Sequence, residues 1–130
     1  MPERRDDLRI LSARLLTLHT VLLADARHAY EATHGPTNPA ALLRLLIHDE
    51  HFAWLRSLSA LIAQIDEALD PREPAADIDV ESFFQAAQGL LRSGDSGAFH
   101  MKYRDALQRS PELVMAHANV VKVLAGRATG

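Results

Sequence analysis

The sequence is defined first by what it lacks. Its 130 residues include no cysteine, which excludes a disulfide framework and thiolate metal ligands. No stretch approaches the roughly 18 apolar residues of a membrane span, and the charged amino terminus is not a signal peptide. No glycine-rich phosphate loop or nucleophile elbow is present. We therefore expect a cytoplasmic protein that does not bind membranes. The absence of a phosphate loop and of a nucleophile elbow argues against the enzyme classes that use these motifs.

The charge balance and composition narrow the class further. The net charge is −3 and the signs are mixed along the chain, so no basic patch for nucleic acid is expected. The hydrophobic share of 48% and the charged share of 24% are those of an ordinary globular protein rather than a disordered one. The length predicts a single domain over residues 1–130, large enough to bury a core.

Leucine and alanine dominate the apolar residues, which favours helices, and no strand pattern appears. Gly35-Pro36 ends one helical block, and Asn38-Pro39 and Ser110-Pro111 each combine an N-cap with a proline in the first turn. We expect an all-α, antiparallel four-helix-bundle-like domain with two long helices followed by three shorter ones. The expected helices cover residues 5–33, 38–69, a third from 77 or 79 to about 92, 98–108 and 110–125.

Apolar residues recur at helical spacing and predict the core faces. The first helix carries Leu8, Leu11, Leu15, Leu22, Leu23, Ala26 and Tyr30. The second carries Ile47, Trp54, Leu55, Leu58, Leu61, Ile62 and Ile65. The last carries Leu113, Val114, Val120, Val121 and Leu124.

Histidines fall on or beside each of these faces. His19, His51 and His117 point inward at 100° per residue, and His48 lies at the margin of the second face. Inward side chains of a bundle are where metal and cofactor sites are built, and imidazole binds zinc, iron and haem. These four residues are therefore candidate ligands for a divalent metal or haem. The alternative is that each is a core histidine that hydrogen-bonds to a neighbouring side chain.

The stretch LLIHDEHF resembles the LLHD signature of the all-helical HD-type phosphohydrolases. That resemblance implies a divalent metal bound by His19, by the pair His48-Asp49 and by a late aspartate, for which Asp105 is available. In that family the His-Asp pair closes a helix, whereas here we expect the helix to continue through FAWLRSLSALIAQIDEALD. The LLxH segment is also similar to that of DinB-like four-helix bundles, although His117 has Val121 four residues on where those proteins carry a second histidine.

The longer segment LLRLLIHDEHFAWLRSLSALIAQIDEALD resembles a recurring element of small bacterial all-helical proteins that have no assigned activity. The resemblance covers mainly residues 40–70. It implies a bacterial cytosolic protein and transfers no biochemical activity to this chain.

Residues 42–47 are apolar nearly all round the helix, a pattern typical of a segment that a second subunit covers. We therefore expect a non-enzymatic bundle that acts as an interaction or regulatory module, as a homodimer or with another protein partner. The expected interface residues are Leu42, Leu46, Phe52 and Trp54. The alternatives are a metal-, haem- or small-ligand-binding bundle and an HD-type phosphohydrolase, so whether the protein is an enzyme stays open.

Overall fold

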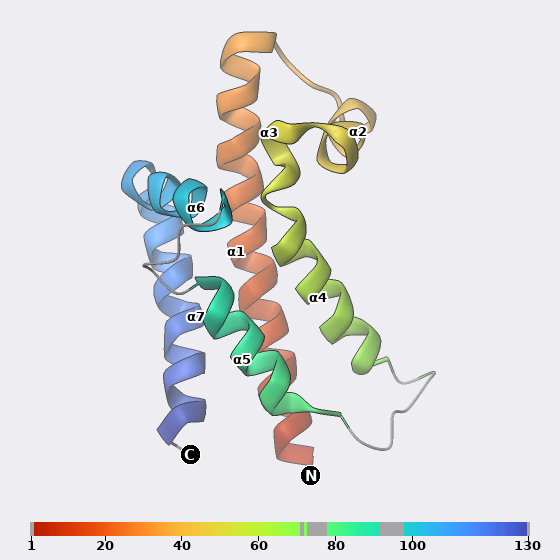
Figure 1. Cartoon of the computed structure of the whole chain (residues 1–130), viewed down its shortest axis with the longest axis vertical. Coiled ribbons are helices and arrows are strands. Elements are labelled where there is room, and N and C mark those ends of the chain that lie inside the picture. The colour runs from red at the N-terminus through yellow and green to blue at the C-terminus, as the bar shows by residue number, and fades with distance from the viewer. Residues whose placement is uncertain (1, 71, 73–77, 92–97, 130) are drawn as a thin grey trace.

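The computed structural model describes residues 2–70, 72, 78–91 and 98–129, and the side chains of residues 2–4, 50, 51, 98 and 127–129 lie outside that description. Within these ranges the chain is all-helical, as predicted, with no strand (Figure 1). No helix in the described part is both long and apolar enough to cross a membrane.

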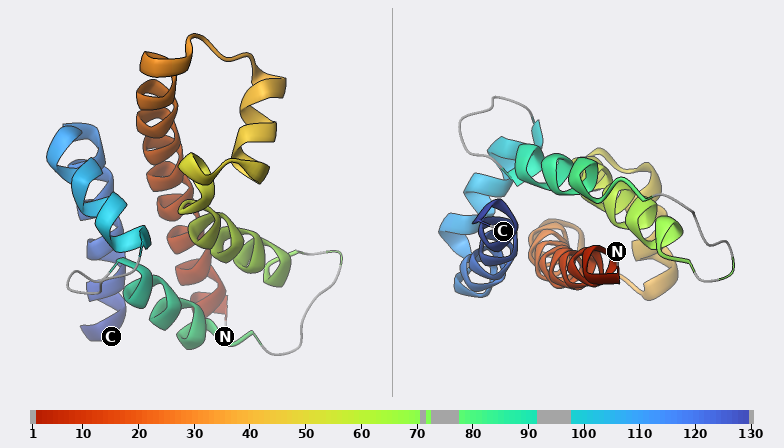
Figure 2. Two further views of the ribbon diagram at one scale, coloured as in Figure 1. Left: turned by 45° about the horizontal axis from the view of Figure 1, so that its top comes forward. Right: turned by 90° about the horizontal axis from the view of Figure 1, so that it is seen from below.

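Helix α1 (Pro2–His34) is the central element. It packs against α7 (Pro111–Thr129), α4 (Arg56–Ala68) and α5 (Val80–Leu91). Seen from below in Figure 2, α1 and α7 form one layer and α4 and α5 cross it as a second. The buried stripe of α1 runs almost its full length, with spacings of three and four residues, through Leu8, Leu11, Leu15, Leu18, Leu22 and Ala26.

The second expected helix is not continuous, and the prediction that it runs from 38 to 69 is wrong. It is divided into α2 (Pro39–His48), α3 (Glu50–Ala53) and α4. Asp49 ends α2 in an extended conformation with φ −88° and ψ 137°. The break turns the following segment so that Phe52 is fully buried and its ring lies 5.7 Å from that of Tyr30.

The later helices begin where the sequence predicts. The Asp79 carboxylate accepts a hydrogen bond from the Ser82 amide at 3.0 Å, ahead of α5. The Ser110 hydroxyl oxygen accepts one from the Leu113 amide at 3.1 Å, so Ser110 caps α7, and Pro111 opens that helix. Between these helices lies α6 (Ala98–Arg109), whose Arg109 donates to Asp25 of α1 at 2.6 Å.

The buried apolar residues form one cluster, and most residues of the predicted core faces belong to it. The α4 positions at 55, 58, 61, 62 and 65 are all buried, as predicted. Three predicted core residues are instead exposed: Ile47 at 53%, Val114 at 48% and Val121 at 43%. Ile47 is exposed because the break at Asp49 separates α2 from the face that α4 presents to α1.

Candidate functional site

His19 and His117 occupy separate places and have separate partners. His19 is half-buried on α1, and its Nε2 lies 2.7 Å from the hydroxyl of Ser59 on α4. His117 is half-buried on α7, and its Nδ1 lies 2.6 Å from the hydroxyl of Tyr103 on α6. Burial lowers the pKa of both imidazoles and raises that of the Tyr103 phenol. A neutral imidazole beside a protonated hydroxyl fits the alternative interpretation, in which each histidine is held by a hydrogen bond to a neighbouring side chain.

The metal prediction can be followed only for the three candidate ligands that the structure describes. His48 is exposed at the end of α2, and the side chain of His51 lies outside the description. Among the described residues no group of three or more histidine, aspartate or glutamate side chains is placed to hold a metal ion.

The residues carried over from the HD-type resemblance are likewise not assembled. The pair His48-Asp49 does close a helix, which is the local geometry of that family and corrects our expectation of a continuous helix. However, His19 is hydrogen-bonded to Ser59, and Asp105 is exposed on α6.

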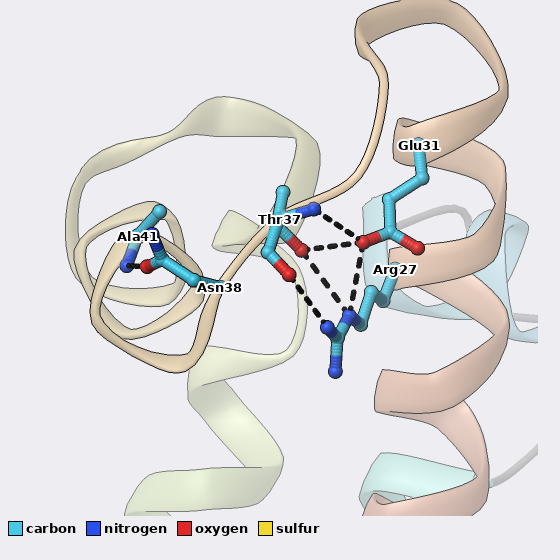
Figure 3. Close-up of polar contacts among 5 residues, drawn as sticks. All are labelled: Arg27, Glu31, Thr37, Asn38 and Ala41. Carbon is cyan, nitrogen blue, oxygen red and sulfur yellow. Dashed lines mark hydrogen bonds and ion pairs between the residues drawn. The ribbon is translucent and has the colours of Figure 1, made fainter.

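The most organised polar contacts lie where α1 turns toward α2 (Figure 3). The Glu31 carboxylate accepts hydrogen bonds from the amide and hydroxyl of Thr37 at 2.7 Å and 2.6 Å. Arg27 donates to the same carboxylate at 3.2 Å and to the Thr37 carbonyl at 2.8 Å. The hydrogen bonds from Thr37, with a smaller contribution from Arg27, lower the pKa of Glu31 to about 2. We call Arg27, Glu31 and Thr37 the loop clamp.

Two further local features complete the turn that the loop clamp holds. Gly35 takes φ +84°, a left-handed conformation that ends α1 and that side chains disfavour, and its amide donates to the Glu31 carbonyl. Asn38 then caps α2, accepting a hydrogen bond from the Ala41 amide at 2.8 Å (Figure 3). The start of α2 is therefore fixed by polar contacts rather than by core packing.

A pocket of about 520 Å³ lies between the end of α1 and α2. Its lining combines aromatic, basic and amide groups: Tyr30, His34, Pro36, Thr37, Asn38, Ala41, Arg44, Leu45, His48 and Asp49. The rings of Tyr30 and His34 are stacked, with centroids 4.1 Å apart and planes 10° from parallel. We call this the α1–α2 pocket. His48 is the one predicted ligand that it includes.

α2 also carries apolar side chains on its exposed side. Its inward side packs against the core through Leu42, Leu45 and Leu46, which are half-buried. The outward face consists of the exposed residues Pro39, Ala40, Leu43 and Ile47. Leu43 is 58% exposed and Ile47 53%, and α2 contains no fully buried residue. A helix on the surface of a globular protein normally turns only polar residues to the solvent, so these two large apolar side chains depart from the usual pattern.

An apolar hollow of about 290 Å³ adjoins this outward face. It is lined by Leu46, Ile47, Phe52, Leu55, Arg56 and Ser59. Arg56 donates to the Leu46 carbonyl at 3.2 Å, which ties α4 to α2 across it. Ser59 also borders a second hollow of about 230 Å³ beside His19, with Leu16, Ile62, Ala63 and Asp66. The two hollows extend the apolar surface from α2 along the junction of α4 and α1.

The predicted interface residues divide between this surface and the core. Leu42 and Leu46 are half-buried on α2 and pack against the core, and Leu46 also lines the hollow. Phe52 is fully buried in the single chain, so its side chain is not accessible to a partner and its expected interface role is corrected to core packing. Trp54 is half-buried and lies against Phe99 of α6, with ring centroids 5.6 Å apart.

Comparison of this chain with protein-family models, with curated proteins and with solved structures finds no match. The resemblances drawn from the sequence therefore stay predictions. The sequence analysis used the apolar circumference of residues 42–47 to predict an interface, but it did not name Leu43 among the interface residues. It assigned Ile47 to the core face because it placed residues 38–69 on one helix, and it took Arg44 as an ordinary surface charge.

Proposed function

We propose that this protein is a non-enzymatic, cytoplasmic helical interaction module of bacterial type that forms a homodimer through α2. In this proposal α1, α4, α5 and α7 serve as an antiparallel four-helix bundle that carries α2 on one side. The observation that supports it most directly is the outward face of α2, where Leu43 and Ile47 are each more than half exposed. Contiguous exposed apolar surface is a common mark of a protein interaction site.

A second copy of the chain is the partner that this surface favours. In a two-fold dimer the same patch lies on both sides of the interface and must be complementary to itself. Here a protruding apolar helix lies directly beside an apolar hollow. Rotation about a two-fold axis places the α2 helix of each copy against the hollow of the other.

The size of α2 argues that the hollow must take part. A ten-residue helix is only about 15 Å long. Stable interfaces bury about 800 Å² on each partner, more than one face of such a helix supplies. In this proposal the apolar surface that continues through the hollow toward Ser59 and Leu16 adds to the area buried on each copy.

The test is the mass of the protein in solution, measured by light scattering and by sedimentation. We expect the wild type at twice the chain mass of 14.4 kDa. The double variant Leu43→Glu/Ile47→Glu should be a monomer, because it would bury four carboxylates in the dimer. Its circular dichroism should match the wild type, since both side chains are exposed in the single chain.

Met115→Glu is the matched control. Met115 is 66% exposed on α7, so this variant adds charge to an equally exposed apolar position outside α2. It should leave the dimer intact. A wild type that stays monomeric up to high concentration, or a double variant that still dimerises, would contradict the proposal.

A further inference from the structure

The α1–α2 pocket brings several hydrogen-bond donors together on the inner side of α2. Arg44 and His48 are four residues apart on one face of the helix, and both line the pocket. The Asn38 side-chain oxygen is committed to its cap, which leaves the amide nitrogen of the same side chain as a donor. Among the described residues Arg44 makes no ion pair. Among the described lining residues Asp49 is the one carboxylate, so donors predominate there.

The remaining lining is apolar and aromatic. Leu45, Ala41 and Pro36 lie along the pocket, and the stacked rings of Tyr30 and His34 form part of its wall. His34 Nδ1 lies 3.1 Å from the Tyr30 carbonyl and 2.9 Å from the Thr33 hydroxyl, so the imidazole is held in its stacked position. Small-molecule sites combine such an apolar lining with a few convergent polar groups, and 520 Å³ lies within their usual volume.

The pocket is also built on a fixed frame. The loop clamp joins the last turns of α1 to Thr37, and the Asn38 cap joins the next residue to α2. These contacts set the separation between the Tyr30–His34 stack and the Arg44–His48 face. A site held in advance in this way loses less entropy when a ligand binds.

We propose that the α1–α2 pocket binds a small organic acid. Its carboxylate accepts hydrogen bonds from Arg44 and His48, with the Asn38 amide beside them. Its apolar or aromatic body lies against Leu45 and the Tyr30–His34 stack. Arginine suits this role because its planar guanidinium donates two parallel hydrogen bonds to one carboxylate. The site lies on the face of α2 opposite to the outward face and does not depend on dimer formation.

The experiment is a titration of ¹⁵N-labelled protein, followed by two-dimensional NMR, with sodium benzoate as the probe. Benzamide is the matched neutral probe, because it keeps the ring and replaces the carboxylate. We expect benzoate to shift the amide signals of Ala41, Arg44, Leu45 and His48, and benzamide to shift them far less. Benzamide binding as well as benzoate, or benzoate shifts spread evenly over the chain, would overturn the proposal.

Arg44→Gln tests the assigned carboxylate partner. Losing a hydrogen bond between charged groups should raise the Kd for benzoate roughly tenfold. Arg104→Gln removes the same charge from an exposed position on α6 and should leave the Kd unchanged. Equal weakening by the two variants would show a general charge effect and would sink the assignment.

The neutral variant Leu43→Gln/Ile47→Gln separates this proposal from the dimer. Neither residue lines the pocket, and glutamine places no carboxylate within one turn of Arg44, so this variant should bind benzoate as the wild type does. If it lost benzoate binding, a site built within one chain would be contradicted. Failure of the dimer with retained benzoate binding would contradict only the proposed function.

Discussion

Helices α2 and α4 come from one stretch of sequence, and they differ in what they bury. The ten residues of α2 are the more apolar, yet none of them is buried. The thirteen residues of α4 carry more polar groups, yet Leu58, Leu61, Ile62 and Ile65 are buried. Hydrophobic content alone therefore does not decide which segment enters the core. The break at Asp49 decides it, because it directs α4 against α1 and leaves α2 beside the bundle (Figure 1).

The two helices are also held in different ways. α4 is held by its buried leucines and isoleucines, and by the Ser59 hydroxyl beside His19. α2 is held at its start by the loop clamp and the Asn38 cap, and near its end by the hydrogen bond from Arg56 to the Leu46 carbonyl. Full burial of four side chains stabilises α4 as part of the global fold, whereas α2 combines these polar contacts with the partial burial of Leu42, Leu45 and Leu46.

The largest expected difference comes from the same substitution made in each helix. Leu58→Ala removes a fully buried side chain and should lower the free energy of unfolding by about 2–5 kcal/mol. Leu43→Ala alters a side chain that is 58% exposed and should change the free energy of unfolding by less than about 0.5 kcal/mol. Urea unfolding at low protein concentration, where association contributes least, measures both values. A comparable loss for Leu43→Ala would mean that α2 belongs to the core after all.

Acid should weaken the packed layers before it weakens the loop clamp. Burial lowers the pKa of His19 and His117 below the ordinary 6.5, so the unfolded chain takes up protons first as the pH falls. The stability from these two groups is therefore complete above pH 6.5 and is lost as the pH falls through their lowered pKa values. The local stability that Glu31 gives the loop clamp is complete above pH 4.5 and is lost toward about pH 2.

The measurement for this prediction is the urea midpoint at about pH 8 and about pH 5. From the higher to the lower pH the urea midpoint should decrease in the wild type. It should decrease less in the double variant His19→Gln/His117→Gln. His28→Gln, at an exposed position of α1, should behave as the wild type. If the double variant were as sensitive to acid as the wild type, the two buried imidazoles would not be responsible.

The sequence predicted the elements that carry explicit signals. Gly35-Pro36, Asn38-Pro39 and Ser110-Pro111 mark helix ends that the structure confirms, and periodicity gave the buried faces of α1 and α4. The sequence analysis could not predict the break at Asp49, since no glycine or proline marks that position. The break accompanies the burial of Phe52 beside Tyr30 of α1, a tertiary contact that local helix preference does not encode.

The same limit explains the site. Helical periodicity identified the inward-facing histidines. It does not give their positions relative to the other helices or their hydrogen-bond partners, so Ser59 and Tyr103 could not be assigned to them. The α1–α2 pocket exists only because α2 turns beside the end of α1. Of its basic residues the sequence singled out His48, whereas Arg44 was read as ordinary surface charge.

The last variant should change the global stability least, and it tests most directly whether α2 and α4 are held by different contacts. Glu31→Gln keeps the shape of the side chain but removes the charge that accepts from Thr37 and Arg27. The amides within α2 should then exchange with solvent faster, while those of α4 and the urea midpoint stay nearly as in the wild type. Glu67→Gln makes the same change at an exposed position of α4 and should alter neither. Faster exchange in α2 and α4 alike would mean that the loop clamp supports the whole bundle, and the distinction between a packed helix and a positioned one would then fail.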